Sequence, residues 1–369
     1  MKYIIRAVIV LIILVVLRVT YNTRWIWRDY INSPPVEFTE NEHISVALYP
    51  EGYHSATIFT NEGISAVSLP KSINMLRVLL MNLDVPGTIF VTPFHCGKDK
   101  LKKDDQQCHE LAKLQAYGFE IAQSGCFDYS FAGNDEMIRP SREQELESIR
   151  LNRKILIELG FKIDGYRTTS LSIPEELPGI LDELGYLYGS NFSVPPLTFR
   201  TFLFPGLRGS AFYPYNPAGL TILEIPSQSK QVLKSITARQ EFEKVHKMGG
   251  VFVFRTEFSR LTEKENWEEL KVFLKYIKKR ETWLCTLGEL SRWWLAREKV
   301  EITTRREGDI INIIYDNQTL VAMKSARFYF KNIPDQPKIY RVINRAGVVS
   351  AEGFIPETRW INVTLFPSR

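Results

Sequence analysis

The stretch Ile58-Phe59-Thr60-Asn61-Glu62-Gly63 decides how this chain is interpreted. It continues an apolar run that begins at Ala56 and has the character of a buried strand. The run ends abruptly in small polar and acidic residues and a glycine. Parallel strands of α/β proteins deliver side chains in this way to the carboxyl end of a sheet, where sites are built. The sequence therefore predicts a strand whose end carries a functional site.

Strand-like and helix-like segments alternate from residue 51 onward, which is typical of βα units around a parallel sheet. The expected strands are Ala56–Phe59, Gly87–Val91, Glu120–Gln123, Gly165–Arg167, Tyr186–Gly189, Thr221–Ile225, Val251–Phe254 and Trp283–Thr286. The expected helices are Lys71–Leu83, Gln107–Tyr117, Ser141–Leu159, Pro174–Leu184, Ile236–Lys247 and Glu263–Arg280. Ser141-Arg-Glu-Gln is a capping-box pattern and marks where one of these helices begins.

The net charge of the chain is concentrated near its N-terminus. The sequence has 47 basic and 42 acidic residues, a formal charge of +5. Five basic residues precede Asp29, the first acidic one, so 42 basic residues face 42 acidic residues in the remainder. These five are Lys2, Arg6, Arg18, Arg24 and Arg28. A neutral body lacks the basic surface that nucleic-acid binding requires, and we expect no nucleic-acid partner.

An apolar segment over residues 4–20 predicts a membrane anchor. Its uninterrupted part, residues 7–17, reaches about the minimum length of a transmembrane helix when its apolar neighbours are added. Arg6 and Arg18 at its ends, and the aromatic residues that follow, suit the membrane interfaces. A cleaved signal peptide is the alternative, although no small-x-small cleavage site follows the run. We expect a single-pass signal anchor over 1–28 that leaves the main body extracytoplasmic.

Two further regions flank the α/β body expected over 51–297. Residues 29–50, with Ser33-Pro34-Pro35, have the composition of an extended linker. Beyond the α/β body, short β-branched and aromatic runs separated by turn residues predict a small all-β domain over 298–369. The runs are Val300–Arg306, Ile310–Tyr315, Ala326–Lys331, Ile339–Asn344 and Trp360–Leu365.

A long insertion between Ser193 and Gly219 is rich in Pro, Phe and Tyr. Loops of this length in compact domains are usually functional or form lids. The aromatic side chains can stack on sugar rings in a substrate groove, or they can form a satellite hydrophobic cluster. The candidates for the groove are Phe199, Phe204, Tyr213 and Tyr215.

Cys96 and Cys108 are separated by a polar, lysine-rich loop. In an oxidising compartment they can close a disulfide, and two unpaired thiols are the alternative.

Three segments follow one another along the expected strands: Val85-Pro-Gly-Thr-Ile-Phe-Val91, Gly118-Phe-Glu-Ile-Ala-Gln-Ser124 and Gly165-Tyr-Arg167. In this order they resemble the polysaccharide deacetylase (NodB-homology, carbohydrate esterase family 4) family over roughly residues 51–295. The first looks like the second strand of that family, the second like its Gly-His-Glu-Ile-Gly-Asn-His segment, and the third like its arginine motif. The resemblance implies a distorted seven-stranded (β/α) barrel with a groove at the carboxyl ends of the strands. It also implies a divalent, zinc-like metal held by one aspartate and two histidines, with a second aspartate as general base and a late histidine as general acid.

Carried over position by position, this implied site is degenerate. The Thr-Phe-Asp-Asp-Gly motif of the family falls on residues 59–63, so Asn61 replaces the base and Glu62 replaces the metal aspartate. An amide does not accept a proton at useful pH.

The remaining positions of the implied site are altered as well. The two histidine ligands fall on Ser124 and Asp128, and Arg167 matches the arginine that orients the base. The late histidine falls near Arg255 or Thr256 at the end of Val251–Phe254, and a permanently charged guanidinium cannot act as a general acid.

Three hypotheses follow. The first is a catalytically impaired, membrane-anchored protein that binds envelope polysaccharide or an envelope protein, with no metal bound. The second is a divergent hydrolase of the carbon–nitrogen (non-peptide) bonds of N-acetylated polysaccharide, at a site rebuilt from Glu62, Asp128 and Glu257. These carboxylates would hold a zinc-like divalent metal or serve as acid and base. The alternative is that they are solvated or paired with Arg167 and Arg255. The third is a structural subunit of an envelope assembly.

Overall fold

The structure, a computed structural model, describes residues 6, 41–95, 98–125, 141–168, 176–191, 213–227, 235–319, 321–331 and 339–368. Apart from Arg6, the predicted anchor lies outside these residues, as does most of the predicted linker. Within the described residues, no helix has both the length and the apolar character needed to span a bilayer.

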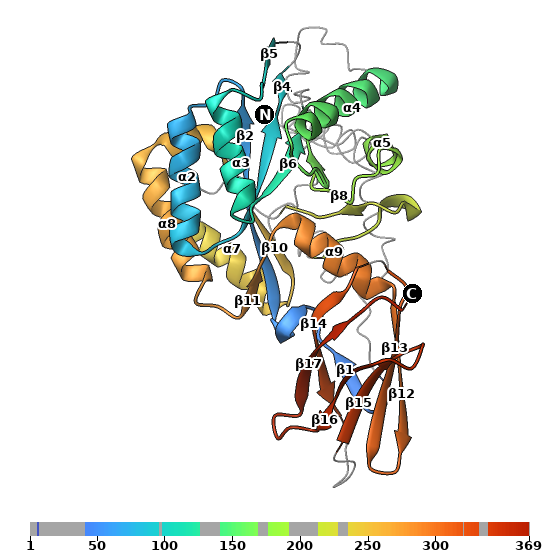
Figure 1. The fold of residues 1–369 in the computed structure, drawn as a ribbon. Coiled ribbons are helices and arrows are strands. Elements are labelled where there is room, and N and C mark those ends of the chain that lie inside the picture. The colour runs from blue at the N-terminus through green and yellow to red at the C-terminus, as the bar shows by residue number, and fades with distance from the viewer. Residues whose placement is uncertain are drawn as a thin grey trace.

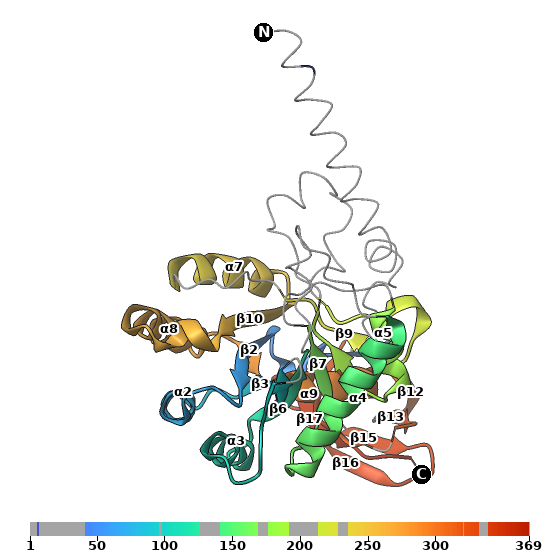
Figure 2. The same cartoon turned by 90° about the horizontal axis from the view of Figure 1, so that it is seen from above.

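A parallel half-barrel forms the centre of the molecule, with helices on its convex side (Figures 1 and 2). Its strands hydrogen-bond in the order β10-β2-β3-β6-β7-β8-β9, and β11 pairs with the first residues of β2. The strands are β2 (Ser55–Ser65), β3 (Gly87–Thr92), β6 (Glu120–Ser124), β7 (Gly165–Arg167), β8 (Tyr188–Gly189), β9 (Leu223–Glu224), β10 (Val251–Glu257) and β11 (Thr282–Leu284). This arrangement agrees with the barrel that the sequence predicts.

The helices that follow the strands pack on the outside of the sheet (Figure 2). They are α2 (Pro70–Leu83), α3 (Gln106–Ala116), α4 (Arg142–Glu158), α5 (Leu177–Glu183), α7 (Ser235–Lys247) and α8 (Lys264–Ile277). The capping box at Ser141 is formed with Gln144, as the sequence predicts. A short hairpin, β4 (Phe94–His95) with β5 (Lys98–Lys100), follows β3, and 3₁₀ turns form at η1 (Pro50–Gly52), η5 (Pro217–Gly219) and η6 (Phe258–Thr262).

Side chains alternate between two buried layers along each strand, as the strand geometry requires. We call the face that packs on α2, α7 and α8 the outer face, and the opposite one the inner face. On β2, Phe59 belongs to the outer cluster with Phe242 and Phe273, whereas Ile58 belongs to the inner cluster with Phe90. This alternation fixes where the polar residues at the end of β2 point.

Helix α9 (Leu287–Glu298) closes the amino end of the half-barrel and is absent from the sequence prediction. Its Thr286–Glu289 capping box is formed, and Trp294 lies in the inner cluster. Glu120, at the start of β6, accepts hydrogen bonds from Gly288 N at 2.8 Å, from the Thr88 hydroxyl at 2.8 Å and from the Tyr188 hydroxyl at 3.0 Å. Burial raises the pKa of Glu120, and these donors oppose that rise.

Two small β-sheets, built from β1 and from the strands after α9, share one hydrophobic cluster. One is the antiparallel set β1 (Ile44–Val46), β14 (Met323–Phe330) and β17 (Trp360–Leu365), and the other contains β12 (Val300–Glu307), β13 (Ile310–Asn317), β15 (Ile339–Asn344) and β16 (Val349–Phe354). Their cluster includes Trp293 of α9, whose indole nitrogen donates to Leu48 O at 3.0 Å. The expected linker over 29–50 is therefore wrong for residues 44–46, which pair with β14 because their alternate apolar side chains complete this core. Strand β16 was not predicted either.

We predict that Glu120→Ala destabilises the protein by about 3 kcal/mol, because buried donors on α9, β3 and β8 lose their acceptor. Urea unfolding followed by tryptophan fluorescence measures the change. Glu158→Ala is the matched control, since Glu158 is exposed and its pair with Lys154 spans 3.8 Å; it should cost less than about 0.5 kcal/mol. Equal costs for the two variants would contradict the role given to Glu120.

Candidate functional site

Strand β2 continues through the stretch that the sequence places at its end. It runs to Ser65, and a register shift against β3 lies between Asn61 and Ile64. Gly63 within this irregularity has φ +88°, a conformation that favours glycine. Because the strand persists through residue 62, Asn61 and Glu62 point to opposite faces of the sheet.

Glu62 points to the inner face, where its carboxylate meets two guanidinium groups. Arg255 Nε donates to Glu62 Oε1 at 2.6 Å, and Arg255 Nη2 also contacts this oxygen. Arg167 Nη1 lies 3.7 Å from Glu62 Oε2, within ion-pair but beyond hydrogen-bond distance. The side chains of Glu62 and Arg255 are 7% and 11% exposed, and that of Arg167 is fully buried. The three residues therefore form a largely desolvated charge cluster.

Arg167 is held by partners from β2, from β3 and from the residue that follows β8. Its Nε donates to Ser190 O at 2.9 Å, its Nη2 to Ser190 Oγ at 2.8 Å, and its Nη1 to Thr60 Oγ1 at 2.8 Å. Its guanidinium lies 4.2 Å from the centroid of the Phe90 ring. Burial lowers the pKa of Arg167 to about 10, with Glu62 opposing that fall, so the group stays charged at neutral pH. Arg167 is thus a fixed buried cation under the strand ends.

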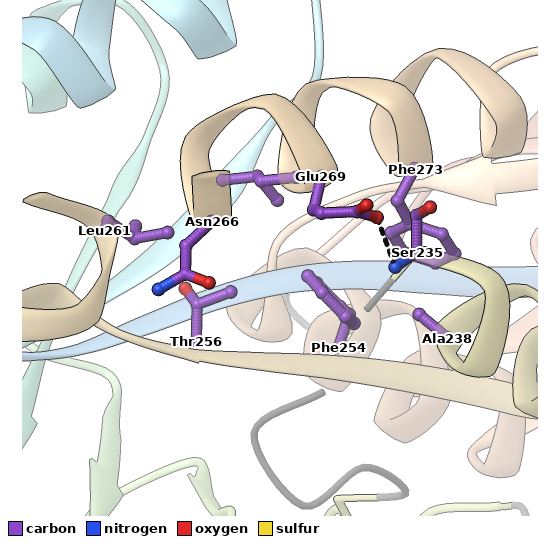
Figure 3. Close-up of a pocket in the computed structure, with 9 residues that line it drawn as sticks. Ser235, Ala238, Phe254, Thr256, Leu261, Asn266, Glu269 and Phe273 are labelled. Atoms are coloured by element: carbon purple, nitrogen blue, oxygen red, sulfur yellow. Dashed lines mark hydrogen bonds between the residues drawn. The ribbon is translucent and has the colours of Figure 1, made fainter. Parts of the chain in front are cut away.

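Asn61 points to the outer face, away from this cluster. Its Nδ2 donates to Thr256 Oγ1 at 2.9 Å, and Thr256 in turn donates to Thr60 O at 3.0 Å. Thr256 lines a small cavity together with residues of α8 such as Asn266 (Figure 3). Asn61 is fully buried, and its Oδ1 has no hydrogen-bond partner among the described residues. The residue that matches the family's base therefore lies on the helix side of the sheet.

Ser124, the last residue of β6, lies on the inner face beside Arg167 in register. The orientation follows from Gln123, which points outward: its Nε2 donates to Ile149 O at 3.1 Å, and its Oε1 accepts from the Tyr186 hydroxyl at 2.6 Å. The structure thus brings Glu62, Arg167, Arg255 and Ser124 to one face. Asp128 lies outside the described residues.

The described part of the aromatic insertion is packed into the body of the protein. Tyr215 is 8% exposed and exchanges two backbone hydrogen bonds with Glu224. The Tyr213 hydroxyl donates to Met248 O at 3.1 Å, and its ring stacks on Trp294. Met248 precedes β10, so Tyr213 lies at the amino end of the strands, opposite the charge cluster. Both placements favour the hypothesis that the tyrosines belong to a hydrophobic cluster over the hypothesis that they line a substrate groove. Phe199 and Phe204 lie outside the described residues.

Cys108 is a buried thiol on α3 with no disulfide partner among the described residues, and burial raises its pKa. Cys96 lies outside the described residues, so the disulfide stays a prediction.

The inner-face residues do not fit the divalent metal that the resemblance implies. Both oxygens of Glu62 face guanidinium groups, and Ser124 offers a neutral hydroxyl where the family has histidine. Like charges 4 Å apart repel by about 4 kcal/mol at an effective dielectric constant of 20, and a doubly charged ion doubles this to about 8 kcal/mol. Among the described residues, no three His, Cys, Asp or Glu side chains are grouped to hold a metal.

Comparison of the whole structure with solved ones identifies the architecture. A putative polysaccharide deacetylase from Mycobacterium smegmatis superimposes with a TM-score of 0.53 at 16% identity, covering 75% of this chain and 99% of the other. The chain has the polysaccharide deacetylase fold. A probable polysaccharide deacetylase from Pseudomonas aeruginosa PAO1 gives 0.46 at 15% identity (66% and 91% covered), and an allantoinase gives 0.47 at 16% identity (69% and 94% covered). No model of a protein family matches the sequence, and no curated protein matches it.

Within this deacetylase fold, the sequence did not reveal that Thr256 fixes Asn61. It left open whether Glu62 is solvated or paired with Arg167 and Arg255, and in the structure Arg255 pairs with it directly. A partial signal existed, because Arg255 and Thr256 extend the apolar run of β10 in the same way that Asn61 and Glu62 extend that of β2. Only the register, which pairs Thr256 with Asn61 and Glu257 with Glu62, brings these residues together.

We predict that Glu62→Gln destabilises the protein by about 3 kcal/mol or more, because two guanidinium groups lose their buried counter-charge. The free energy of unfolding in urea is the readout.

The matched control is Glu257→Gln, on the neighbouring strand in register with Glu62. The Glu257 carboxylate pairs with the half-exposed Arg260 at 3.1 Å, so its loss should cost less than about 1 kcal/mol. A Glu62→Gln variant as stable as this control would refute the pairing.

Proposed function

We propose that this protein is a non-catalytic member of the deacetylase fold that binds cell-envelope polysaccharide. It is held in the membrane by residues 4–20, and its main body is extracytoplasmic. An envelope protein is the alternative ligand, and the binding experiment below separates the two.

The observation that carries this proposal is the state of Glu62. Metal-assisted hydrolysis needs a cation with an open position and a base beside it. In this chain the carboxylate at the ligand position is bonded to Arg255, and the side chain at the base position is an amide that donates to Thr256 on the other face of the sheet. Retention of the fold without these two functions supports a binding role over hydrolysis.

The divergent-hydrolase alternative gains no support from the carboxylates of the described residues. The Glu62 carboxylate forms ion pairs with two arginines. Glu257 accepts from the Ser259 hydroxyl at 2.9 Å and from Arg260 Nε at 3.1 Å, so its carboxylate is already paired at the surface. A rebuilt acid and base pair requires carboxylates that converge on one point.

We expect the full-length protein, solubilised in detergent, to release no acetate from chitooligosaccharide or peptidoglycan above a no-protein blank. Zinc, cobalt and manganese are each tested at one and ten equivalents, with acetate measured enzymatically. Metal-dependent turnover that disappears in Glu62→Gln would overturn the proposal and favour the divergent hydrolase.

We further expect that Asn61→Asp alone does not create deacetylase activity, because residue 61 faces α7 and α8 rather than Glu62. A buried carboxylate beside Thr256 should instead lower stability by roughly 2 kcal/mol. The same acetate assay and urea unfolding measure both effects, with the wild-type protein as reference. Activity in this variant would show that residue 61 reaches the inner face.

Binding is tested by co-sedimentation of the solubilised protein with insoluble peptidoglycan. Retention in the pellet, with release by soluble glycan fragments, is the expected result. A protein that remains in the supernatant with purified glycan but is retained on protein-containing envelope fragments would point to an envelope protein instead.

A further inference from the structure

We infer that the guanidinium of Arg255 takes the place of the metal ion in this fold, so that the chain supplies its own cation to the carboxylate of Glu62. The inference deepens the proposed function, because it says why the inner face keeps its charge balance without a divalent ion. It also changes the chemistry of the site from a metal centre that exchanges ligands to a fixed ion pair.

The register of β10 against β2 makes this substitution possible. Arg255 lies opposite Thr60, two residues before the pair formed by Glu257 and Glu62. Both Arg255 and Glu62 point to the inner face, so the long arginine side chain reaches diagonally toward the strand end. Its Nε and Nη2 both contact Oε1 of Glu62. Two nitrogens of one guanidinium therefore contact Oε1, whereas Oε2 has no hydrogen-bond partner among the described residues and faces Arg167 Nη1 at 3.7 Å.

Arg167 does not have the same role, although it lies in the same cluster. Its three nitrogens each donate to Thr60 or Ser190, and its nearest approach to Glu62 is 3.7 Å. Arg167 therefore organises the strand ends, whereas Arg255 is the direct partner of the carboxylate. Arg255 differs from a titratable histidine, which the resemblance places near Arg255 or Thr256, because a guanidinium remains charged throughout the physiological pH range.

A buried carboxylate needs a counter-charge, and either a metal ion or a guanidinium can supply it. A metal ion supplies it reversibly and makes the fold sensitive to chelators. A covalently attached guanidinium supplies it permanently. The stability of this protein should therefore be independent of divalent metals, while the loss of Arg255 should produce a carboxylate that accepts an added cation.

The first test measures metal binding to the full-length wild-type protein in detergent after dialysis against EDTA. We expect less than about 0.1 equivalent of zinc, cobalt or manganese by elemental analysis after re-addition and desalting, and no change in Tm. About one equivalent of bound metal, with a rise in Tm that is absent in Glu62→Gln, would overturn the inference.

The second test removes the guanidinium. We expect Arg255→Ala to lower the Tm by about 5 °C, and low millimolar guanidinium chloride to restore part of this loss relative to sodium chloride at the same ionic strength. Arg255→Lys keeps a cation and should recover part of the Tm even if the alanine variant does not fold. Arg260→Ala is the matched control, because Arg260 pairs with a carboxylate at the surface. An Arg255→Ala variant as stable as Arg260→Ala would contradict the inference.

The two proposals fail separately. A protein that binds metal but releases no acetate overturns only the role of Arg255. A protein that binds no metal and no envelope component overturns only the binding function.

Discussion

The contact between the Glu62 carboxylate and the Arg255 guanidinium is the interaction on which the rest of the site depends. It joins two neighbouring strands at the carboxyl end of the half-barrel, with Arg167 below it held by Thr60 and Ser190. A single carboxylate between two largely buried cations is costly to desolvate, so the arrangement is stable only while each partner is present. The cluster therefore constrains the positions of β2, β7, β8 and β10 at once.

The alternation of side chains along a strand is the second constraint on the site. Two adjacent polar residues on a continuous strand cannot serve the same side of a sheet. In this chain β2 continues past Glu62, so Asn61 bonds to Thr256 on the helix side while Glu62 enters the charge cluster. The two residues of this pair therefore differ in direction as well as in chemistry. The amide at position 61 satisfies a buried hydroxyl where a carboxylate would carry an uncompensated charge.

Much of the fold could be predicted from the sequence, because the spacing of apolar residues indicates which side chains of each strand and helix are buried. The prediction for β7 agrees with the structure at both ends, and α2 begins one residue before its predicted start, at a proline in the first turn. Helix α9 was missed although Thr286 and Glu289 form the same kind of capping box as Ser141 and Gln144. The short strand β1 was missed because its three residues precede the α/β body by sequence and pair with residues 328–330. Long-range pairing of this kind leaves little local signal.

The candidate site was predictable only as a set of positions. The sequence located Glu62, Arg167 and Arg255 at strand ends, but their mutual contacts depend on register, and register follows from tertiary packing.

The pairing of Glu62 with Arg255 in place of a metal is tested most directly by a crystal structure of the protein grown with zinc, with diffraction recorded on both sides of the zinc absorption edge. We predict that Arg255 Nε lies within hydrogen-bond distance of the Glu62 carboxylate and that no anomalous peak appears beside that carboxylate. A zinc peak coordinated by Glu62, with Arg255 displaced, would contradict it.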